Sequence, residues 1–463
     1  MSGNRPEQTI EAVLGRIKKP SRVVVTAGMP YANGPLHLGH LAGAQIPADI
    51  CARYHKMLIG SDKVLFVCGT DDHGSTSEVA ALKAGKSIQD FIQDIHKLQR
   101  TTMERYGINL DNYSGTSTPE TFELHKNNCQ DILRQLHQNG LISKRTSKQW
   151  YDPKVERFLP DRYVNGTCPS CEAEKAYSDQ CDTCGAEYAP DALLNPKSTI
   201  SDATPELRET DHWWLDMWSL TDPLIEWIES RKKLWRKGVY NEVINTVLPV
   251  CSFTKEREED YKAIKSDLPK HKARYAPGKR VALQFMNLKE LKAGRQSLTD
   301  AGIETELKDG WAYRSITRDV SWGIPLPTEL DPEMADKTLY VWPDSLIAPI
   351  AFTQVALKNK GLSPDSYKDY WTAPDSRVFQ FLGQDNVFFY VLMQGALWLG
   401  SQKETNRQPV EGEKQLTDIF GCFHLQINGE KMSKSTGNFF TGDQLLDEMA
   451  ADPDHCLLYT SPS

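Results

Sequence analysis

Two short segments, far apart in the chain, carry residue types that bind phosphate. The first, residues 30–40, follows an apolar run at 23–25 and contains His37, Gly39 and His40. Two imidazoles three residues apart share one face where a turn enters a helix, and a helix N-terminus favours an anion. Two surface histidines on a helix are the ordinary interpretation of such a pair. The Gly/Pro-rich turn after a strand makes a ligand site the better interpretation.

The second segment, residues 431–438, holds Lys431 and Lys434 with hydroxyl side chains between them and Gly437-Asn438 behind. Such a loop can bring ammonium groups onto a pyrophosphate leaving group and stabilise charge that grows in the transition state. A solvated lysine loop is the alternative for this segment taken alone. In this order in one chain, the two segments predict an ATP-dependent adenylating enzyme.

Carboxylates follow two predicted strands. Asp71 stands in an Asp-Asp-His run after the strand expected at 63–68, where it can hold an ammonium group; a plain turn is the alternative. Gly383 and Asp385 follow the strand expected at 377–382, where a carboxylate can hold a ribose.

Four of the ten cysteines form two Cys-x-x-Cys pairs separated by nine residues. This spacing fits a tetrahedral zinc site of four thiolates, which leaves no open coordination position and is therefore structural. Buried free thiols or a redox pair are the alternatives. A free-standing nucleic-acid-binding zinc ribbon would leave the other motifs unexplained. The expected ligands are Cys168, Cys171, Cys181 and Cys184.

A parallel α/β sheet has to position these side chains. Strands are expected at 23–26 and 63–68 with a helix from 37 to about 57 between them, and ligands bind beyond the carboxyl ends of such strands. Similar patterns recur along the rest of the chain. They predict helices at 87–106, 119–139, 212–235 and 388–399, and strands at 338–342 and 377–382.

Length and charge bound the possible functions. A chain of 463 residues is long enough for two or three domains, and its net charge of −8 means that nucleic-acid contact would come from local patches. No stretch approaches the roughly 20 apolar residues that span a bilayer, and residues 1–20 lack an apolar signal core. We therefore expect a cytoplasmic protein with no membrane partner, whose oligomeric state the sequence leaves open.

These motifs resemble class I aminoacyl-tRNA synthetases, and within that class the methionyl-tRNA synthetase family. The resemblance runs from about Arg22 to about Asp452, except for residues 251–310, and includes the segments 158–162, 194–198 and 316–319. It implies an α/β fold with a Rossmann-like, doubly wound parallel sheet, split by a zinc-binding connective insertion.

The resemblance also implies a reaction and a set of site residues. Methionine and ATP, with Mg²⁺, would form methionyl-adenylate and pyrophosphate, and the methionyl group would then pass to tRNA. The catalytic residues would be His37, His40, Lys431, Lys434 and Arg318. ATP would also contact Gly39, Gly383, Asp385 and Lys434. The amino-acid pocket would comprise Gly28, Met29, Tyr31, Asp71, Trp342, Asn386 and Tyr390.

Departures from the family pattern keep two other functions open. Four of the pocket residues (Gly28, Met29, Asn386 and Tyr390) differ from the usual ones, and a misplaced polar group can exclude a ligand. A ligase for another amino acid or for a non-tRNA acceptor is therefore the first alternative. The second is a catalytically inactive paralogue that binds tRNA or a partner, against which the intact histidines and Lys434 argue.

The expected domain organisation follows from these segments. Residues 251–310 contain 13 Lys/Arg against 10 Asp/Glu, so we expect a solvated insertion there, with tRNA contact as the minority hypothesis. The anticodon-binding domain of the family is expected to be absent, which predicts poor tRNA recognition. The expected parts are an N-terminal extension (1–20), the first half of the catalytic domain (21–140), the zinc-binding insertion (141–245), the charged insertion (246–310), the second half of the catalytic domain (311–420), the lysine-loop segment (421–454) and a non-native tail (455–463).

Overall fold

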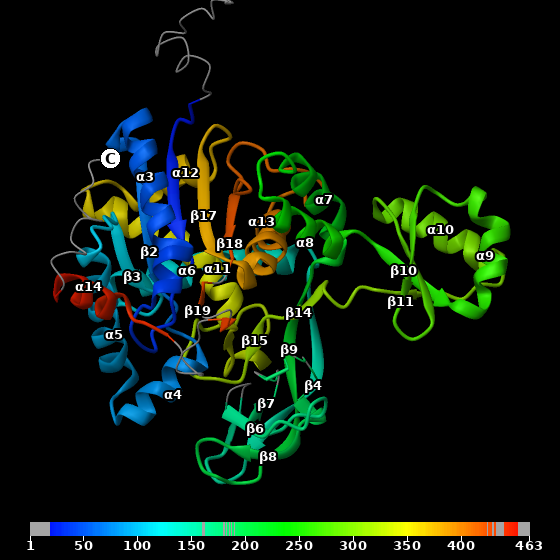
Figure 1. Ribbon diagram of the computed structural model, residues 1–463, viewed down its shortest axis with the longest axis horizontal. Coiled ribbons are helices and arrows are strands. Elements are labelled where there is room, and N and C mark those ends of the chain that lie inside the picture. Colours follow the sequence, from blue (N-terminus) through cyan, green and yellow to red (C-terminus); the bar gives the residue numbers. More distant parts are fainter. Residues whose placement is uncertain are drawn as a thin grey trace, which may run out of the picture.

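The computed structural model consists of a large body from which a smaller lobe projects on one side (Figure 1). It describes residues 19–159, 163–178, 181, 183–184, 186, 188, 190–423, 425–427, 430–431 and 439–451. Among these residues, every helix is either too short or too polar to cross a bilayer.

Five parallel strands form the centre of the body, in the order β18-β17-β1-β2-β3. Their bounds are β1 Val23–Ala27, β2 Val64–Thr70, β3 Asn112–Gly115, β17 Arg377–Gly383 and β18 Asp418–Cys422. One half of the sheet runs outward from β1 and the other from β17, so the predicted doubly wound parallel sheet is confirmed. The strand order reverses between β1 and β17, and ligands of such sheets bind at this switch point.

Helices cover both faces of this sheet (Figure 1). One face packs against the helical segment after β1 and against α5, with Val25, Phe66, Ala48 and Met103 in the shared core. These elements are α2 Leu38–His40, the π-helical turn η1 Leu41–Gln45, α3 Ile46–Ile59 and α5 Ile88–Arg105. The predicted helices at 37–57 and 87–106 are thus present.

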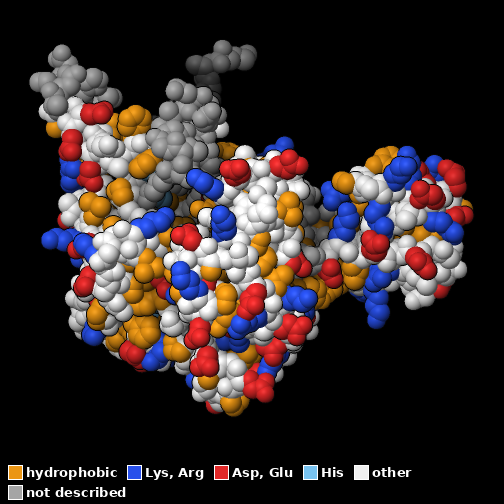
Figure 2. Space-filling model, turned by 90° about the horizontal axis from the view of Figure 1, so that it is seen from below, with side chains coloured by type: hydrophobic (Ala, Val, Ile, Leu, Met, Phe, Trp, Pro, Cys, Tyr) orange, Lys and Arg blue, Asp and Glu red, His pale blue; other side chains and the backbone are white. Residues whose placement is uncertain are grey.

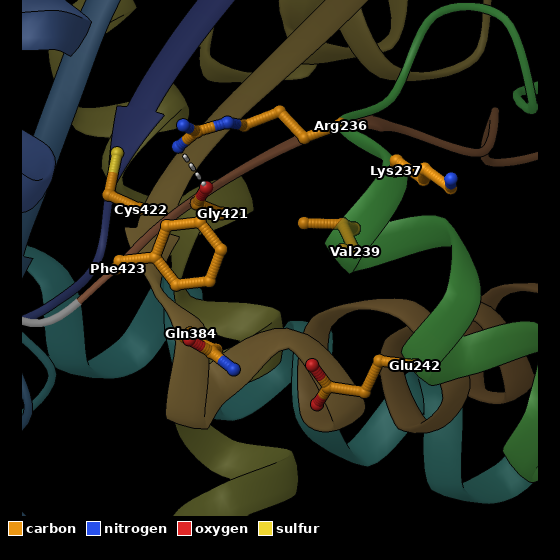
Figure 3. Close-up of a pocket in the computed structure, with 9 residues that line it drawn as sticks. Arg236, Lys237, Val239, Glu242, Gln384, Gly421, Cys422 and Phe423 are labelled. Carbon is orange, nitrogen blue, oxygen red and sulfur yellow. Dashed lines mark hydrogen bonds between the residues drawn. The ribbon is translucent and has the colours of Figure 1, made fainter.

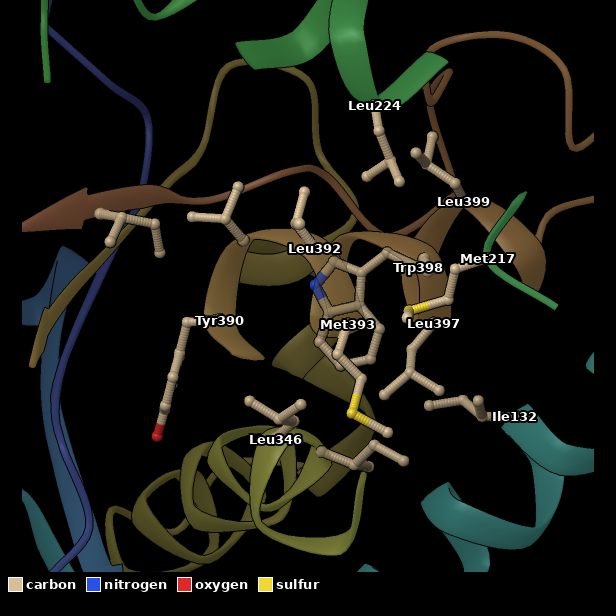
Figure 4. Packing of buried hydrophobic residues seen from close by; sticks show 14 of the residues in the cluster. Ile132, Met217, Leu224, Leu346, Tyr390, Leu392, Met393, Leu397, Trp398 and Leu399 are labelled. Carbon is tan, nitrogen blue, oxygen red and sulfur yellow. The ribbon is translucent and has the colours of Figure 1, made fainter. Parts of the chain in front are cut away.

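The other face packs against α6 (Pro119–Gln138), α11 (Val341–Asn359), the π-helical turn η11 (Phe389–Met393) and α13 (Gln394–Gly400). Figure 4 shows Leu346 of α11, Ile132 of α6 and Trp398 of α13 meeting in one cluster. Because α11 lies between the sheet and other helices, it is apolar on nearly every side and buried along most of its length.

A second, antiparallel sheet in the order β14-β9-β4-β5 extends from the body and carries the paired cysteines beyond it. Its strands are β4 Ile142–Asp152, β5 Arg157–Phe158, β9 Glu206–Asp216 and β14 Tyr313–Ser315. A small sheet of β6 Val164–Thr167, β7 Ala176–Tyr177 and β8 Leu194–Ser198 holds the cysteine turns. The predicted helix at 212–235 is wrong at its start, because His212 lies in β9 and pairs with β4; only α7 (Thr221–Ser230) is helical as expected.

Residues 250–307 form the projecting lobe. Four antiparallel strands, β10 Val250–Thr254, β11 Lys272–Ala276, β12 Arg280–Gln284 and β13 Glu306–Leu307, pack against α9 Glu258–Ile264 and α10 Leu288–Asp300. Phe253, Leu283, Phe285 and Leu298 are fully buried in the core of this lobe. The insertion expected at 246–310 is thus a folded lobe, in which the charged residues surround a hydrophobic core.

The remaining elements complete the two layers around the sheets. The predicted strand at 338–342 is confirmed only for β16 (Thr338–Leu339), because Tyr340 precedes α11 and Trp342 and Pro343 already lie in its first turn. Proline suits the first turn of a helix, where no intrahelical N–H bond is needed. The other elements are α4 Ser75–Ala84, α8 Lys237–Val247, α12 Lys368–Trp371, α14 Gly442–Ala451, β15 Thr317–Arg318, β19 Gln426–Ile427 and β20 Glu430–Lys431.

Candidate active site

The two histidines of the first motif lie directly after β1, at the switch point of the sheet. His37 precedes α2 in extended conformation and its ring stacks on that of His40, with the ring centroids 3.7 Å apart. The His37 backbone N–H donates to His40 Nδ1 at 3.3 Å. A Cβ at Gly39 would lie 2.9 Å from the His37 ring, so glycine is needed there for the stacked arrangement. The pair thus forms a compact imidazole surface at a helix N-terminus.

The chain that follows the second motif returns to this pair. The Leu38 N–H donates to the carbonyl of Phe440 at 3.1 Å, and the Gly442 N–H donates to the carbonyl of Leu36 at 2.9 Å. Phe439 meets the ring of His37 edge-on, with the centroids 6.3 Å apart. Residues 439–442 therefore tie the end of the lysine segment to the histidine motif. Lys434 itself lies outside the described residues, as does the side chain of Lys431 at the end of β20.

Asp71 stands at the carboxyl end of β2, beside the turn that carries Tyr31. Its backbone N–H donates to the carbonyl of Pro30 at 3.0 Å, and its own carbonyl accepts from Ala32. The side chain is only 5% exposed, and its Oδ1 has no hydrogen-bond partner in the part of the chain that the structure describes. Burial, together with Asp344 and Asp72, raises the pKa of Asp71 well above its usual range. A buried acceptor of this kind is suited to a cationic ligand.

A buried carboxylate, Asp344, connects three elements behind Asp71. Its Oδ2 lies 2.6 Å from His73 Nδ1 at the end of β2, and its Oδ1 is hydrogen-bonded to His125 Nε2 of α6. Burial alone would raise the pKa of Asp344, but His73 and His125 hold it well below its usual range. The Trp322 indole N–H donates to the carbonyl of Asp72 at 2.8 Å, so a further segment of the chain is attached to the turn that carries His73.

Four side chains in successive contact form an aromatic wall that runs from Arg318 to Phe389. The Arg318 guanidinium lies 3.6 Å from the ring centroid of Tyr340, which stacks on Trp342 at 5.5 Å. The Trp342 ring in turn meets Phe389 of η11 edge-on at 3.7 Å. Arg318 also donates to the carbonyl of Thr317, so its position is fixed by the strand pair β15–β16. The predicted catalytic Arg318 and the predicted pocket residue Trp342 are thus placed in one stack.

Two π-helical turns adjoin the switch point. Such turns are rare and are frequently found at functional sites. The first, η1, carries the buried Gln45, whose Nε2 reaches the carbonyl of Gly28 at 3.4 Å and Cys68 Sγ at 3.6 Å. The second, η11, carries Tyr390, which is 7% exposed and stands at the edge of the apolar cluster with its hydroxyl directed away from it (Figure 4). Burial raises the pKa of Tyr390, and Cys68, Asp71 and Tyr31 raise it further.

The remaining predicted pocket and nucleotide residues lie at the ends of β1 and β17. The Gly28 N–H donates to the carbonyl of Phe381 at 2.6 Å, and Met29 packs against the main core. Gly383 ends β17, and the short turn η10 (Gln384–Asn386) follows it. Asp385 and Asn386 are exposed in this turn.

A pocket of about 130 Å³ lies beside η10, between α8 and the end of β18 (Figure 3). The Arg236 guanidinium donates to the carbonyl of Gly421 at 3.2 Å and lies over the ring of Phe423. Gln384 and Glu242 line the opposite side. Burial raises the pKa of Glu242, with a further contribution from Asp385, so this pocket and the end of β17 share one electrostatic environment.

The four paired cysteines come together at the tip of the second sheet. Their Sγ atoms all lie within 4.8 Å of one another. Cys168 and Cys184 are 3.8 Å apart, as are Cys171 and Cys181, so each contact joins one pair to the other. The Cys168 N–H donates to the carbonyl of Ala173, and the Ser170 N–H points to Cys168 Sγ at 3.3 Å. Two turns that direct four thiols to one point can hold a tetrahedral metal ion.

The sequence interpretation missed Asp344 and His125. Asp344 lies in the apolar α11 and His125 on the buried side of the amphipathic α6, more than 200 residues away in the chain, and no local pattern relates them. His73 in the Asp-Asp-His run was the one local indication of this network, because a histidine at a buried strand end needs a hydrogen-bond partner. The Lys337–Asp319–His212 cluster, in which Asp319 accepts from both neighbours, was missed for the same reason.

Comparison with known proteins decides the family. The family model described as tRNA synthetases class I (M) matches residues 23–275 and 279–460. The chain belongs to this family. Membership agrees with the parallel sheet and with the histidine motif at its switch point.

The family's curated members include close relatives of the chain. It is 35% identical over 434 residues to a methionine–tRNA ligase of Salinibacter ruber, covering 93% of the chain and 50% of the relative. It is 34% identical over 440 residues to a methionine–tRNA ligase of Rubrobacter xylanophilus, covering 94% of the chain and 64% of the relative. The chain thus spans about half to two thirds of the length of these class I (M) relatives.

A solved class I structure shares the fold. The methionyl-tRNA synthetase of Mycobacterium tuberculosis, determined with bound methionyl-adenylate, matches with a TM-score of 0.54 at 19% identity. The match covers 92% of the chain and 61% of that protein. The likeness at this identity concerns the fold.

Proposed function

We propose that this chain activates methionine with ATP, forming methionyl-adenylate and pyrophosphate, and transfers the methionyl group to tRNA. The observation that carries the proposal is the stacked His37–His40 pair at the switch point, held against the chain that follows the lysine segment. The curated relatives, which are methionine–tRNA ligases, support the same substrate.

The residues would divide the work by position. His37 and His40 would donate hydrogen bonds to the phosphates as charge develops on them, and the helix N-terminus would favour the same charge. Lys434 and Lys431 would close over the leaving pyrophosphate, because their segment ends at Phe439 beside His37. Gly39 would leave room for the phosphates. Orientation and electrostatics supply the acceleration, and no side chain needs to become covalently attached.

The amino acid would lie between Asp71 and the aromatic wall. The buried Asp71 carboxylate would bind the ammonium group, while Tyr31, Trp342 and Tyr390 would enclose the side chain. Gly28, Met29 and Asn386 would complete the pocket. Arg318 would keep Trp342 in place through Tyr340, since the three are stacked.

The nucleotide would lie over the end of β17. Gly383 admits close approach, and Asp385 in the exposed turn after it would accept hydrogen bonds from the ribose hydroxyls. Mg²⁺ would accompany ATP through its phosphates. We assign no protein ligand to that ion.

We further propose that the four cysteines bind one structural zinc ion. The donor set fits, because four thiols from two Cys-x-x-Cys turns converge within 4.8 Å, which is the arrangement of a closed tetrahedral site. The ion would hold the tip of the connective insertion together and take no part in the chemistry.

The proposed function is tested by amino-acid-dependent ATP–pyrophosphate exchange with each of the twenty amino acids. Exchange with methionine above all others is the expected result. Preferred exchange with another amino acid would favour the first alternative, exchange with any amino acid would eliminate the second, and absence of exchange with all twenty would contradict the proposed function. Transfer is tested separately, by charging of a methionine tRNA transcript.

A further inference from the structure

The projecting lobe has a simple topology that places both of its helices on one face of its sheet. Its elements follow the order strand, helix, strand, strand, helix, strand, and the sheet order is β11-β12-β10-β13. In this βαββαβ arrangement both helices pack on the same face of the sheet. The opposite face has no helix of the lobe against it.

The strand register separates the side chains of the two faces. Leu283 pairs with Cys251, and Val281 pairs with Phe253; these four residues belong to the core shared with α9 and α10. Because side chains alternate along a strand, their neighbours point to the other face. On β11 and β12 these neighbours are Lys272, Arg274, Arg280, Ala282 and Gln284. We call this surface the basic sheet face.

Charge is distributed unevenly in the lobe. Its α9 and α10, together with the short helical turns 255–257 and 265–267, carry seven Lys/Arg and seven Asp/Glu, whereas the rest of residues 250–307 carries five Lys/Arg and two Asp/Glu. Lys272 and Arg274 are exposed, lie two residues apart on β11, and form no ion pair in the part of the chain that the structure describes. Arg280 lies across β10, where its Nε donates to Ser252 Oγ at 3.0 Å, and it is paired with Glu306. The excess positive charge of the lobe is thus on its sheet side.

The chemistry of this face favours a polyanion backbone over other ligands. Sheets that read RNA bases carry aromatic residues for stacking on the exposed face, whereas the central positions here are Ser252 and Ala282. Cations above small side chains contact phosphates, which gives affinity without sequence preference and a strong dependence on salt.

The position of the face relative to the body agrees with such a partner. In Figure 1 the strands of the lobe lie on the side nearer the body, with α9 on the far side. Figure 2 shows Lys and Arg side chains gathered on the part of the lobe that borders the body. The side of the lobe that carries its labelled strands is thus the side nearer the body.

We propose that the basic sheet face, through Lys272 and Arg274 on its edge strand β11, binds the phosphate backbone of RNA, and in the proposed function that of the tRNA. The identification of this RNA as tRNA rests on the proposed function. The binding of RNA by this face rests on its charges alone and does not depend on that function. The face supplies affinity that is independent of sequence, at a distance from the reacting groups.

The test compares two double variants of the 463-residue chain. Lys272→Gln/Arg274→Gln removes two charges from the basic sheet face, and Lys289→Gln/Lys292→Gln removes two exposed charges from α10 on the opposite side. Binding of a methionine tRNA transcript, and of a hairpin RNA of unrelated sequence, is measured from 50 to 300 mM salt. Amino-acid-dependent exchange is measured on the same preparations.

For the sheet variant we expect an affinity loss of about tenfold or more at 0.15 M salt, and a salt slope smaller by roughly 1.5, because each lost phosphate contact removes about 0.7–0.9. The loss should be equal for both RNAs, and the α10 variant should stay within about twofold of the parent. Equal losses in both variants, unchanged binding in the sheet variant, or no RNA binding by the parent would each overturn the proposal. Competition by polyglutamate as effective as that by RNA would instead assign the face to an acidic protein.

The exchange measurement separates this inference from the proposed function. Both double variants should exchange at the parent rate, since neither touches the active site. If no amino acid supports exchange while the sheet variant still loses RNA affinity, the proposed function fails and the RNA-binding face stands. If exchange is normal and the sheet variant binds RNA like the parent, the inference fails and the proposed function stands.

Discussion

Asp344 Oδ2 lies 2.6 Å from Nδ1 of His73, although 271 residues separate the two in the chain. His73 stands two residues after Asp71, and Asp344 stands two residues after Trp342. The contact therefore links the chain next to Asp71 to the chain next to Trp342, through side chains that are 2% and 0% exposed.

Replacing Asp344→Asn should destabilise the fold and loosen the pocket. Removing one partner of a buried charged pair costs about 3–5 kcal/mol, measured here as the free energy of unfolding in urea. In the exchange assay the KM for the amino acid should rise more than kcat falls. The exposed Asp369→Asn is the matched control. If Asp344→Asn does not fold, the milder His125→Gln should show the same KM effect; an unchanged KM would contradict the positioning role.

Because of the Asp344–His73 contact, the free energy of unfolding should decrease both when the pH rises and when the pH falls. Burial would lower the pKa of His73, but Asp344 raises it, so its contribution is complete below about pH 6.5 and is lost as pH rises through the folded pKa. The pKa of Asp344 is lowered, so its contribution is present above about pH 4 and is lost as pH falls. The stability difference between the parent and Asp344→Asn should therefore be largest between these limits, as measured by unfolding at a series of pH values.

Amino-acid binding should weaken as pH falls. Burial, Asp344 and Asp72 raise the pKa of Asp71, and only its ionised form attracts an ammonium group. The KM for the amino acid should therefore rise with decreasing pH already above pH 4, where an ordinary aspartate stays ionised. Asp71→Asn should raise KM by about tenfold to a hundredfold and remove this pH dependence. The exposed Asp365→Asn should keep the parent profile, and a flat profile in the parent would refute the assignment.

Two glycines of one helical segment provide a matched pair. A Cβ at Gly39 would lie 2.9 Å from the His37 ring, whereas a Cβ at Gly43 would meet no atom within 4 Å. Gly39→Ala should displace the ring and lower the exchange kcat by about a hundredfold, the effect of misplacing a reacting group by about 1 Å. Gly43→Ala should keep its activity and gain about 0.5–1 kcal/mol in free energy of unfolding. Equal kcat values in the two variants would argue against a role of the stacked histidines.

The cysteine cluster should bind one zinc ion per chain. Elemental analysis of the purified protein should give close to one equivalent, and Cys181→Ser should reduce it strongly, because a thiolate ligand is lost from a closed site. Cys51→Ser, which changes a thiol outside the cluster, should leave the zinc content unchanged. The loss should make residues near the cluster more sensitive to protease before the parallel sheet unfolds. A zinc content that does not respond to Cys181→Ser would disprove the site.

Local sequence patterns predicted the strands and helices whose apolar residues follow a regular spacing within one short segment. The apolar runs of β1 and β2 and the helical periodicity of α5 and α6 are visible within one window each, and these elements are present as expected. His212 was placed in a helix because an aromatic stretch fits either element, and its pairing with β4 decides for the strand. The lobe core was hidden because its apolar residues are interleaved with charges.

The candidate site was predictable where it is built from motifs, and not where it is built from distant pairs. The stacking of Arg318 on Tyr340 follows from the pairing of β15 with β16, which brings residues about 20 apart in sequence together. The roles of Asp344 and His125 depend on how α6 and α11 pack on one face of the sheet. No residue in either helix indicates its partner in the other.

The order of the central strands has a consequence for how the protein is made. Val23 of β1 pairs with Arg377 of β17, about 350 residues later, so the switch point is formed between the beginning and the end of the described chain. At 5–20 residues per second, a ribosome takes roughly 20–70 s to synthesise the missing neighbour of β1. During that time the apolar edge of β1 has no strand beside it on that side, while the cysteine-bearing tip and the lobe can already fold. Nascent chains stalled before residue 377 should therefore bind chaperones that chains stalled beyond residue 422 no longer need.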